Sequence, residues 1–411
     1  MDDATRQALQ DAAQALRPRE SGSEPPAFVA PTAPFEEPRV VGLGRPGDGS
    51  RGTTRVQLGL LRYLIEDCEF QVIGFDGEFA SALALDAYVA GDVDARASAL
   101  DQLRSSPWEG GVGHNFLEWL REFNAHRAAG DRVRVTGLDA RRPASIISCL
   151  RSYFEGVDPA FLETVEHNLH RIEALSQTVD MGTEEGLSLT SHTDQDDARE
   201  ELIAEADRLV PSLRERLEDQ ESSYVSTSGR REWERATHLV TLLEAAVAVQ
   251  RPLAQQASGD IEAETARQRV RHLAAVGMAD NVDWVLGFEA AASMAILAPN
   301  DTVAREEHRD EGVGVGIRLL GSVLAARYGD AYCALKTDSK TAAGSEGTCG
   351  DGTVTTNSSG FDVLASTLAR VDAPGALLDF GRARSDDSVA EWLDDTEVEG
   401  SFDGYCTATG H

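Results

Sequence analysis

Apolar residues along this chain follow two patterns, one typical of strands and one typical of helices. The strands that short apolar runs predict cover residues 40–43, 72–75, 133–138, 294–298, 332–335 and 376–380. The helices that apolar residues at helical spacing predict between them cover 53–67, 79–90, 114–128 and 313–328. Strands that alternate with helices indicate βαβ units, and hence an α/β fold with a mostly parallel sheet flanked by helices.

The middle of the chain has a different pattern. Between residues 145 and 290 it predicts long helices with acidic outer faces. The clearest is 230–250, in which Trp233, Leu239, Leu242, Leu243 and Val247 lie at helical spacing. We interpret this stripe as core packing and the whole region as a large all-helical insert in the α/β domain.

These patterns suggest four parts. Residues 1–38 form a polar N-terminal segment with a Pro-rich linker, and 39–144 form the first half of the α/β domain. Residues 145–290 form the helical insert. Residues 291–411 form the second half of the α/β domain, with a Gly/Ser/Thr-rich flexible loop at 338–360.

The charge balance limits the environment and the partners. The net charge is −32, from 38 basic and 70 acidic side chains, and only Lys336 and Lys340 are lysines. A surface this acidic repels itself unless salt screens it, so we expect a high-salt cytoplasm such as that of halophilic archaea. We expect no nucleic-acid partner, because phosphate recognition requires a basic stripe.

Cysteine usage and hydropathy also favour a cytoplasmic location. The five cysteines are widely separated, so neither a disulfide framework nor a structural metal is indicated. No signal pattern opens the chain and nowhere do 18 apolar residues run together, so we expect a cytoplasmic protein without a membrane partner. The sequence indicates no cofactor, and it leaves the oligomeric state open.

The first predicted strand is followed by a glycine motif. Gly42, Gly44 and Gly47 fit the GxGxxG pattern of dinucleotide sites, and Asp76 ends the next strand. Residues 48–52 separate the motif from its helix, however, and Asp76 lies farther along than the usual acid. Dinucleotide binding is therefore the weakest of our functional hypotheses.

Carboxylates follow the next two strands, where ligands bind in parallel sheets. Asp76 and Glu78 are suited to acid/base chemistry, or alternatively to capping the helix at 79–90. Asp139 ends the third strand and can pair with Arg141 or Arg142. No histidine follows a predicted strand, and no serine-nucleophile motif is present.

Six segments, in order, resemble the erythromycin esterase family. They are VVGLGRPGDGSRGTTRVQLGLLRYLIED, QVIGFDGEFASALALDAYVAGD, SPWEGGVGHNFLEWLREFNAH, RVRVTGLD, GMADNVDWVLG and ILAPNDTVARE. Members of this family hydrolyse esters such as macrolide lactones with a water activated by histidine and glutamate.

The resemblance implies that most of the family's catalytic residues are replaced. Arg45 stands in place of a glutamate, Asp48 in place of a histidine, and Asp76 in place of a second glutamate. The other replaced positions are Ala274, Ala275, Pro299 and Thr302. The residues that match the family pattern are Gly42, Gly44, Gly49, Trp108, Asp139, Met278, Asn281, Ala298 and Asn300.

The resemblance therefore predicts an erythromycin-esterase-like protein, by descent linked to antibiotic response, that binds a ligand and is catalytically impaired. Arginine cannot act as a base, and pairing of Arg45 with Asp48 or Asp76 would neutralise the old site. The residues that we expect around a small-molecule ligand are Arg45, Asp139, Asn300, Thr302 and Trp108. The alternative is an active hydrolase built on Asp48, Asp76 and Glu78, with His114 or His308 reaching in.

Overall fold

The computed structural model describes residues 1–19, 26–28, 38–46, 51–103, 110–175, 193–306, 308–309, 316–339, 360–368, 370–371, 373, 375–396 and 401–408. Its strands are β1 (Gln14–Ala15), β2 (Val40–Arg45), β3 (Val72–Glu78), β4 (Arg134–Asp139), β5 (Met294–Pro299), β6 (His308–Arg309), β7 (Gly316–Ile317), β8 (Tyr332–Ser339), β9 (Gly375–Asp379) and β10 (Gly404–Ala408). Its helices are α1 (Asp3–Ala12), α2 (Arg51–Glu66), α3 (Phe79–Val89), α4 (Arg96–Leu103), α5 (Gly111–Ala125), α6 (Pro143–Val157), α7 (Pro159–Glu173), α8 (Thr193–Asp219), α9 (Glu221–Ser228), α10 (Arg230–Ala257), α11 (Ala263–Phe288), α12 (Asn300–Val303), α13 (Leu320–Tyr328), α14 (Gly360–Leu368), α15 (Phe380–Ala383) and α16 (Asp387–Asp395).

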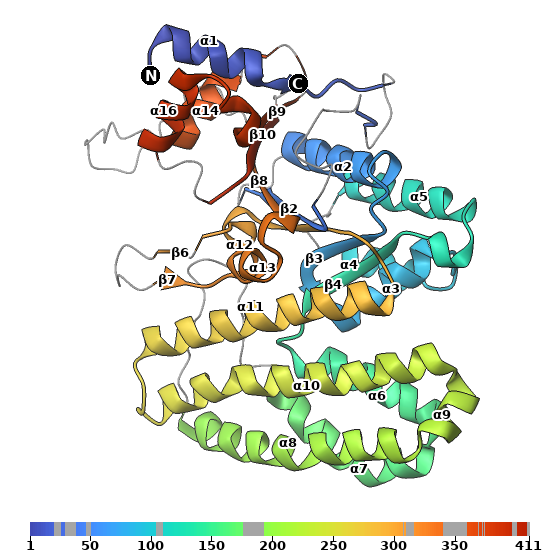
Figure 1. The fold of residues 1–411 in the computed structure, drawn as a ribbon. Coiled ribbons are helices and arrows are strands. Elements are labelled where there is room, and N and C mark those ends of the chain that lie inside the picture. The colour runs from blue at the N-terminus through green and yellow to red at the C-terminus, as the bar shows by residue number, and fades with distance from the viewer. Residues whose placement is uncertain are drawn as a thin grey trace. The chain divides into compact units, whose positions relative to one another are not determined.

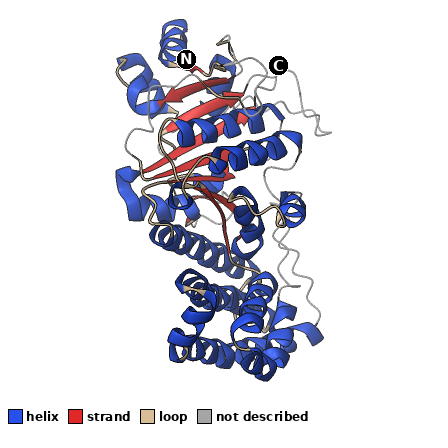
Figure 2. Ribbon diagram, turned by 90° about the vertical axis from the view of Figure 1, so that its right-hand side faces the viewer, coloured by secondary structure: helices blue, strands red, loops and turns tan. Residues whose placement is uncertain are grey.

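Eight of the strands form one sheet, in the order β1-β9-β10-β8-β2-β5-β3-β4. β2 pairs in parallel with β5 and β8, β3 with β5, and β10 with β8, whereas β9 runs antiparallel to both of its neighbours. Figure 2 shows helices on either side of these strands. The predicted α/β fold, with a mostly parallel sheet flanked by helices, is confirmed.

All six strands expected from the sequence are present, each within a few residues of its predicted bounds. β10 was not predicted, although it lies inside the sheet between β8 and β9. The helix expected over 313–328 is shorter, because Leu320 begins α13 and Gly316–Ile317 pairs with β6 in a separate two-stranded sheet. Of the expected loop 338–360, Asp338 and Ser339 belong to β8, Gly360 begins α14, and 340–359 lie outside the described residues.

The chain divides into two compact units. The first contains residues 1–76, 84–136 and 282–411, which include most of the sheet. The second contains residues 77–83 and 137–281, which include the last residues of β3 and β4 and most of the long helices. The carboxyl ends of β3 and β4 thus fall in the second unit, together with α6 to α10.

The helices of the second unit pack as the apolar stripe predicts. Leu239, Leu242, Leu243 and Val247 are buried on α10, and Trp233 at its start donates its indole N–H to the carbonyl of Leu217 on α8 at 3.0 Å. Figure 1 shows α8 and α10 side by side. The stripe therefore forms core, as predicted.

Part of the N-terminal segment packs into the first unit. α1 buries Leu9, and β1 pairs with β9 and forms an edge of the sheet. The amide of Leu16 donates to the carbonyl of Gly375 at 2.8 Å, and the Leu16 side chain is buried. In the described part of 1–38, Leu9, Leu16 and Phe28 are therefore core residues, which the polar composition of this segment did not suggest.

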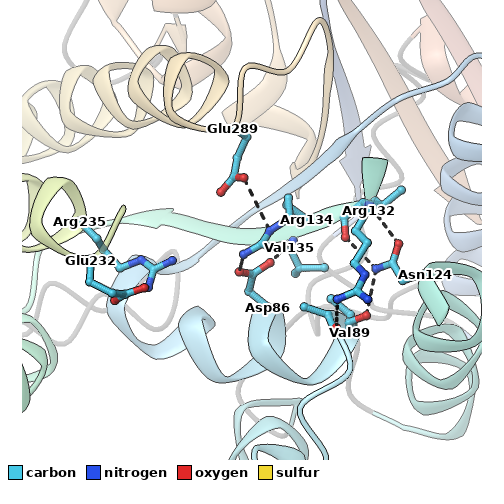
Figure 3. A network of polar contacts seen from close by, with 11 residues as sticks. Asp86, Val89, Asn124, Arg132, Arg134, Val135, Glu232, Arg235 and Glu289 are labelled. Carbon is cyan, nitrogen blue, oxygen red and sulfur yellow. Dashed lines mark hydrogen bonds and ion pairs between the residues drawn. The ribbon is translucent and has the colours of Figure 1, made fainter. Parts of the chain in front are cut away.

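A buried polar network holds the amino end of β4 in the first unit (Figure 3). Arg134, the first residue of β4, pairs with Asp86 on α3, and its Nε lies 3.8 Å from Oε2 of Glu289. Asp86 also accepts the amide N–H of Val135 at 3.1 Å. Burial, opposed by Arg134, raises the pKa of Asp86. The network ties α3 to the start of β4.

Candidate functional site

At the carboxyl edge of the sheet in the first unit, Arg45 and Asp76 form an ion pair. Arg45 ends β2, Asp76 lies near the end of β3, and β5 lies between these two strands. Nη2 of Arg45 donates to Oδ2 of Asp76 at 2.9 Å, and both side chains are partly exposed. Of the two pairings that the sequence analysis left open for Arg45, this one is present.

One hydrogen-bond donor of the Arg45 guanidinium, its Nε–H, is not used by the described residues. This Nε is buried and has no hydrogen-bond acceptor among the residues that the structure describes. A buried N–H without an acceptor costs about 1–3 kcal/mol, so an oxygen atom brought by a ligand would remove that cost. Arg45 is thus suited to hold an acceptor oxygen at the carboxyl edge.

Asn300, expected near a ligand, is committed to holding the sheet together. From α12 it donates from Nδ2 to the carbonyl of Thr337 at 3.0 Å and accepts the amide N–H of Thr337 at Oδ1 at 3.1 Å. A Cβ at Gly44 would collide with the same Oδ1, so only glycine fits there. Asn300 and Gly44 therefore fix the relative positions of β2, α12 and β8.

The glycine motif is explained by the same packing. Gly42 and Gly44 lie inside β2 rather than in a turn, and a Cβ at Gly42 would lie 2.6 Å from the Tyr332 hydroxyl and 2.9 Å from Cβ of Val303. These glycines permit close packing on α12, which gives no support to a dinucleotide loop. Gly47 lies outside the described residues.

Three other predicted site residues are placed less fully. Thr302 lies half-buried in α12. Asp48 and Trp108 lie outside the described residues, so their predicted roles stay predictions.

In the second unit, Glu78 and Asp139 each bind an arginine. Glu78 lies 3.3 Å from Nη1 of Arg142 and accepts the Ser81 hydroxyl at 3.1 Å. Asp139 accepts the backbone N–H of Arg141 at 2.9 Å and two donors of its guanidinium at 2.6 to 2.9 Å. The pairing left open for Asp139 is therefore with Arg141, while Arg142 binds Glu78.

A buried histidine that was not among the predicted site residues lies in the second unit. His238 lies on α10, and its Nε2 is 2.7 Å from Oδ1 of the fully buried Asn281. Asn281 in turn donates to the carbonyl of Leu138, directly before Asp139, at 2.7 Å. The His238 ring also meets Phe79, directly after Glu78, edge-on at 5.3 Å between centroids.

His238 is held in its neutral form. Burial lowers the pKa of its imidazole to about 4, although the hydrogen bond to Asn281 works in the opposite direction. The signal in the sequence was its place within the apolar stripe of 230–250, where a histidine must be buried with the leucines around it.

The histidines considered for catalysis lie elsewhere. His114, on α5, has its Nε2 3.8 Å from Oε1 of Glu118 and is partly exposed. His308 lies on β6, and its side chain is outside the described set. Within the described ranges, no three His, Cys, Asp or Glu side chains are grouped so that they could hold a metal ion, and no helix is apolar over a length that would cross a membrane.

One protein family and three solved structures are similar to this chain. The family model described as erythromycin esterase matches residues 65–408. A solved protein from Bacillus cereus has a TM-score of 0.70 at 16% identity, covering 99% of this chain and 97% of that one. A structure titled succinoglycan biosynthesis protein has a TM-score of 0.69 at 17% identity, with 99% and 96% covered. A mutant of the erythromycin esterase EreC in its open conformation has a TM-score of 0.58 at 17% identity, with 91% of each chain covered. Identities this low show a shared fold.

Proposed function

Because this chain belongs to the erythromycin esterase family, we propose that it binds a small molecule with an acceptor oxygen, such as an ester, and hydrolyses it poorly or not at all. The observation that carries the proposal is the Arg45–Asp76 ion pair with its spare buried donor. The ligand's oxygen would complete the hydrogen bonding of Arg45 at the carboxyl edge of the sheet, where ligands bind in parallel α/β folds.

Weak hydrolysis follows from how the carboxylates are used. A general base must accept a proton from water, and Asp76, Glu78 and Asp139 each already bind an arginine. Arg45 itself stays protonated. The positions that match the family's two final histidines carry Pro299 and Thr302. Loss of a general base alone slows such reactions by roughly 10²–10⁴-fold.

The ligand to test first is a macrolide lactone, because EreC, whose fold this chain shares, is named an erythromycin esterase. We also propose that the protein works in a salt-rich cytoplasm, where its charge of −32 is screened. The full chain should accordingly unfold at higher urea concentration in 3 M than in 0.3 M KCl. A midpoint that falls with added salt would contradict this adaptation.

The central experiment measures binding and turnover separately on the full chain in molar KCl. Calorimetric titration with erythromycin and with 4-nitrophenyl butyrate measures binding, and product release measures turnover. We expect saturable binding of at least one of them, weakened about tenfold or more by Arg45→Gln, since a hydrogen bond to a charged donor contributes about 1.5–3 kcal/mol. The control is Arg62→Gln, because Arg62 pairs with Glu66 on α2 at 3.0 Å.

Two outcomes would change the conclusion. If neither compound binds, the ligand class is wrong. If 4-nitrophenyl butyrate is turned over well above the buffer rate and Asp76→Asn abolishes this, the alternative of an active carboxylate-based hydrolase replaces the impaired one.

A further inference from the structure

We propose that His238 is a positioning residue that holds the carboxyl ends of β3 and β4, and with them Glu78 and Asp139, in fixed positions. One imidazole contacts the chain at both ends: Phe79 follows Glu78, and the hydrogen-bonded Asn281 reaches the carbonyl before Asp139. Glu78 and Asp139 are the carboxylates that the sequence analysis named at these strand ends, and the inference concerns their positions within the second unit, independently of the proposed ligand.

The hydrogen bonds fix the protonation of the ring. A backbone carbonyl only accepts, so the group of Asn281 that faces Leu138 must be its NH₂. Its oxygen then faces His238 and must receive a hydrogen there, so Nε2 carries the proton. In the neutral ring Nδ1 is consequently the unprotonated nitrogen. Two successive hydrogen bonds, from His238 to Asn281 and from Asn281 to Leu138 on β4, fix the Nε2–H tautomer.

The ends of β3 and β4 constrain each other through a direct backbone contact. A Cβ at Gly137 would collide with the carbonyl of Glu78, so the backbones of β3 and β4 touch at this point. A shift of the Gly137–Leu138 backbone would therefore displace Glu78, and a shift of Glu78 would displace Gly137. Further along α3, the carbonyl of Ala80 lies 4.0 Å from the thiol of Cys149 on α6. His238 thus acts on two strand ends that already constrain each other.

The first test examines the unaltered full chain, so it does not depend on a variant that folds. Nitrogen NMR of the ¹⁵N-histidine-labelled protein in molar KCl at pH 7 should assign to His238 one protonated nitrogen, Nε2, and one bare nitrogen, Nδ1. A protonated Nδ1, or an imidazolium at this pH, would contradict the proposed hydrogen bond from His238 to Asn281 and with it the positioning role.

The second test compares His238→Leu with His238→Gln, whose side-chain amide can still donate to Asn281. The readout is hydrogen exchange of the backbone amide of Arg141, which donates to Asp139. We expect about tenfold faster exchange in the Leu variant and a return close to the original rate in the Gln variant, which a loss of packing alone would not produce.

Two controls separate positioning from general weakening of the unit. The amide of Phe161, which caps α7 by donating to Asp158 at 3.1 Å, should exchange at an unchanged rate in both variants. Leu243→Ala removes another fully buried side chain of α10 and should leave the Arg141 amide slow relative to Phe161. Equal acceleration at both amides, or none at Arg141 in the Leu variant, would refute the proposal.

These readouts need no ligand. If neither erythromycin nor the aryl ester binds, the proposed function fails, while the tautomer and the exchange pattern still decide the role of His238.

Discussion

Two arginine–aspartate pairs of the first unit lie at opposite edges of one sheet and differ in their surroundings. Arg45 and Asp76 at the carboxyl edge are 31% and 21% exposed, whereas Arg134 and Asp86 at the amino end of β4 are 18% and 11% exposed. The Nε of each arginine is buried without a hydrogen-bond acceptor among the described residues, but the Nε of Arg134 lies 3.8 Å from a second carboxylate, that of Glu289.

The difference separates a structural pair from one suited to binding. Around Arg134, the two carboxylates of Asp86 and Glu289 balance the charge, and Asp86 also accepts a backbone N–H of β4. Around Arg45, the described residues supply one carboxylate, that of Asp76, and both side chains of the pair are more exposed, so a ligand can reach them. The same two residue types therefore serve different purposes according to what each sheet edge places beside them.

The largest expected effect tests the buried pair. Arg134→Leu should lower the free energy of unfolding by about 3–5 kcal/mol, because it leaves the Asp86 carboxylate buried without its cation. Arg45→Leu should cost no more than about 1 kcal/mol, as for other exposed pairs. Urea denaturation in molar KCl measures both losses, and equal values would show that the two pairs do not differ in their contribution to stability.

His238 extends the comparison to a group buried without a counter-ion. Its folded-state pKa of about 4 lies below the ordinary value of 6.5. Its contribution is therefore complete above pH 6.5 and is lost as pH falls from 6.5 to 4, by up to about 3 kcal/mol. The difference in unfolding free energy between the original chain and His238→Gln, followed over this range, isolates the effect. A constant difference would show that the imidazole is not held neutral.

Asp86 should respond to pH in the opposite direction. Its folded-state pKa is raised, so the native state binds the proton more tightly, and this group favours folding increasingly as pH falls from neutrality. Asp86→Asn, which retains an acceptor for the amide of Val135, should cost about 1–2 kcal/mol at pH 7 and less than Asp86→Ala. Unfolding curves at pH 5 and 7 check the sign, and a cost equal to that of alanine would contradict the role of the acceptor.

The smallest effect concerns the exposed pair alone. A double-mutant cycle of Arg45→Gln and Asp76→Asn should give a coupling energy of about 0.2–1 kcal/mol at low salt, falling in 3 M KCl because salt screens exposed charges. A coupling that does not change with salt would place Arg45 and Asp76 in the same class as Arg134 and Asp86.

Much of the fold was predictable because its signals are local. Apolar runs such as Val72–Phe75 marked strands, and the spacing of Leu239, Leu242 and Leu243 marked a buried helix face. β10 was missed because its sequence, GYCTA, is short and contains no run of aliphatic residues, and it becomes a strand through pairing with β8 and β9.

The candidate site was predictable only in outline. Strand ends directed attention to Arg45, Asp76, Glu78 and Asp139, all of which the structure describes there. Asn300 was expected beside a ligand, and in the structure its side-chain amide forms two hydrogen bonds with the backbone of Thr337. His238 was overlooked because its partners Asn281 and Leu138 are far from it in the chain, and nothing local to α10 points to them.

The alternation of strands and helices and the identity of the residues at the strand ends follow from the amino-acid sequence alone, because both depend on neighbours along the chain. The folded chain was needed to show that Arg45 binds Asp76, 31 residues away, and that Asn281 reaches Leu138 across 143 residues. Hydrogen bonds and ion pairs depend on distance in space, and the folded sheet sets that distance. The Arg45–Asp76 pair with its spare donor is thus a product of the fold acting on residues that the sequence had already placed at its edge.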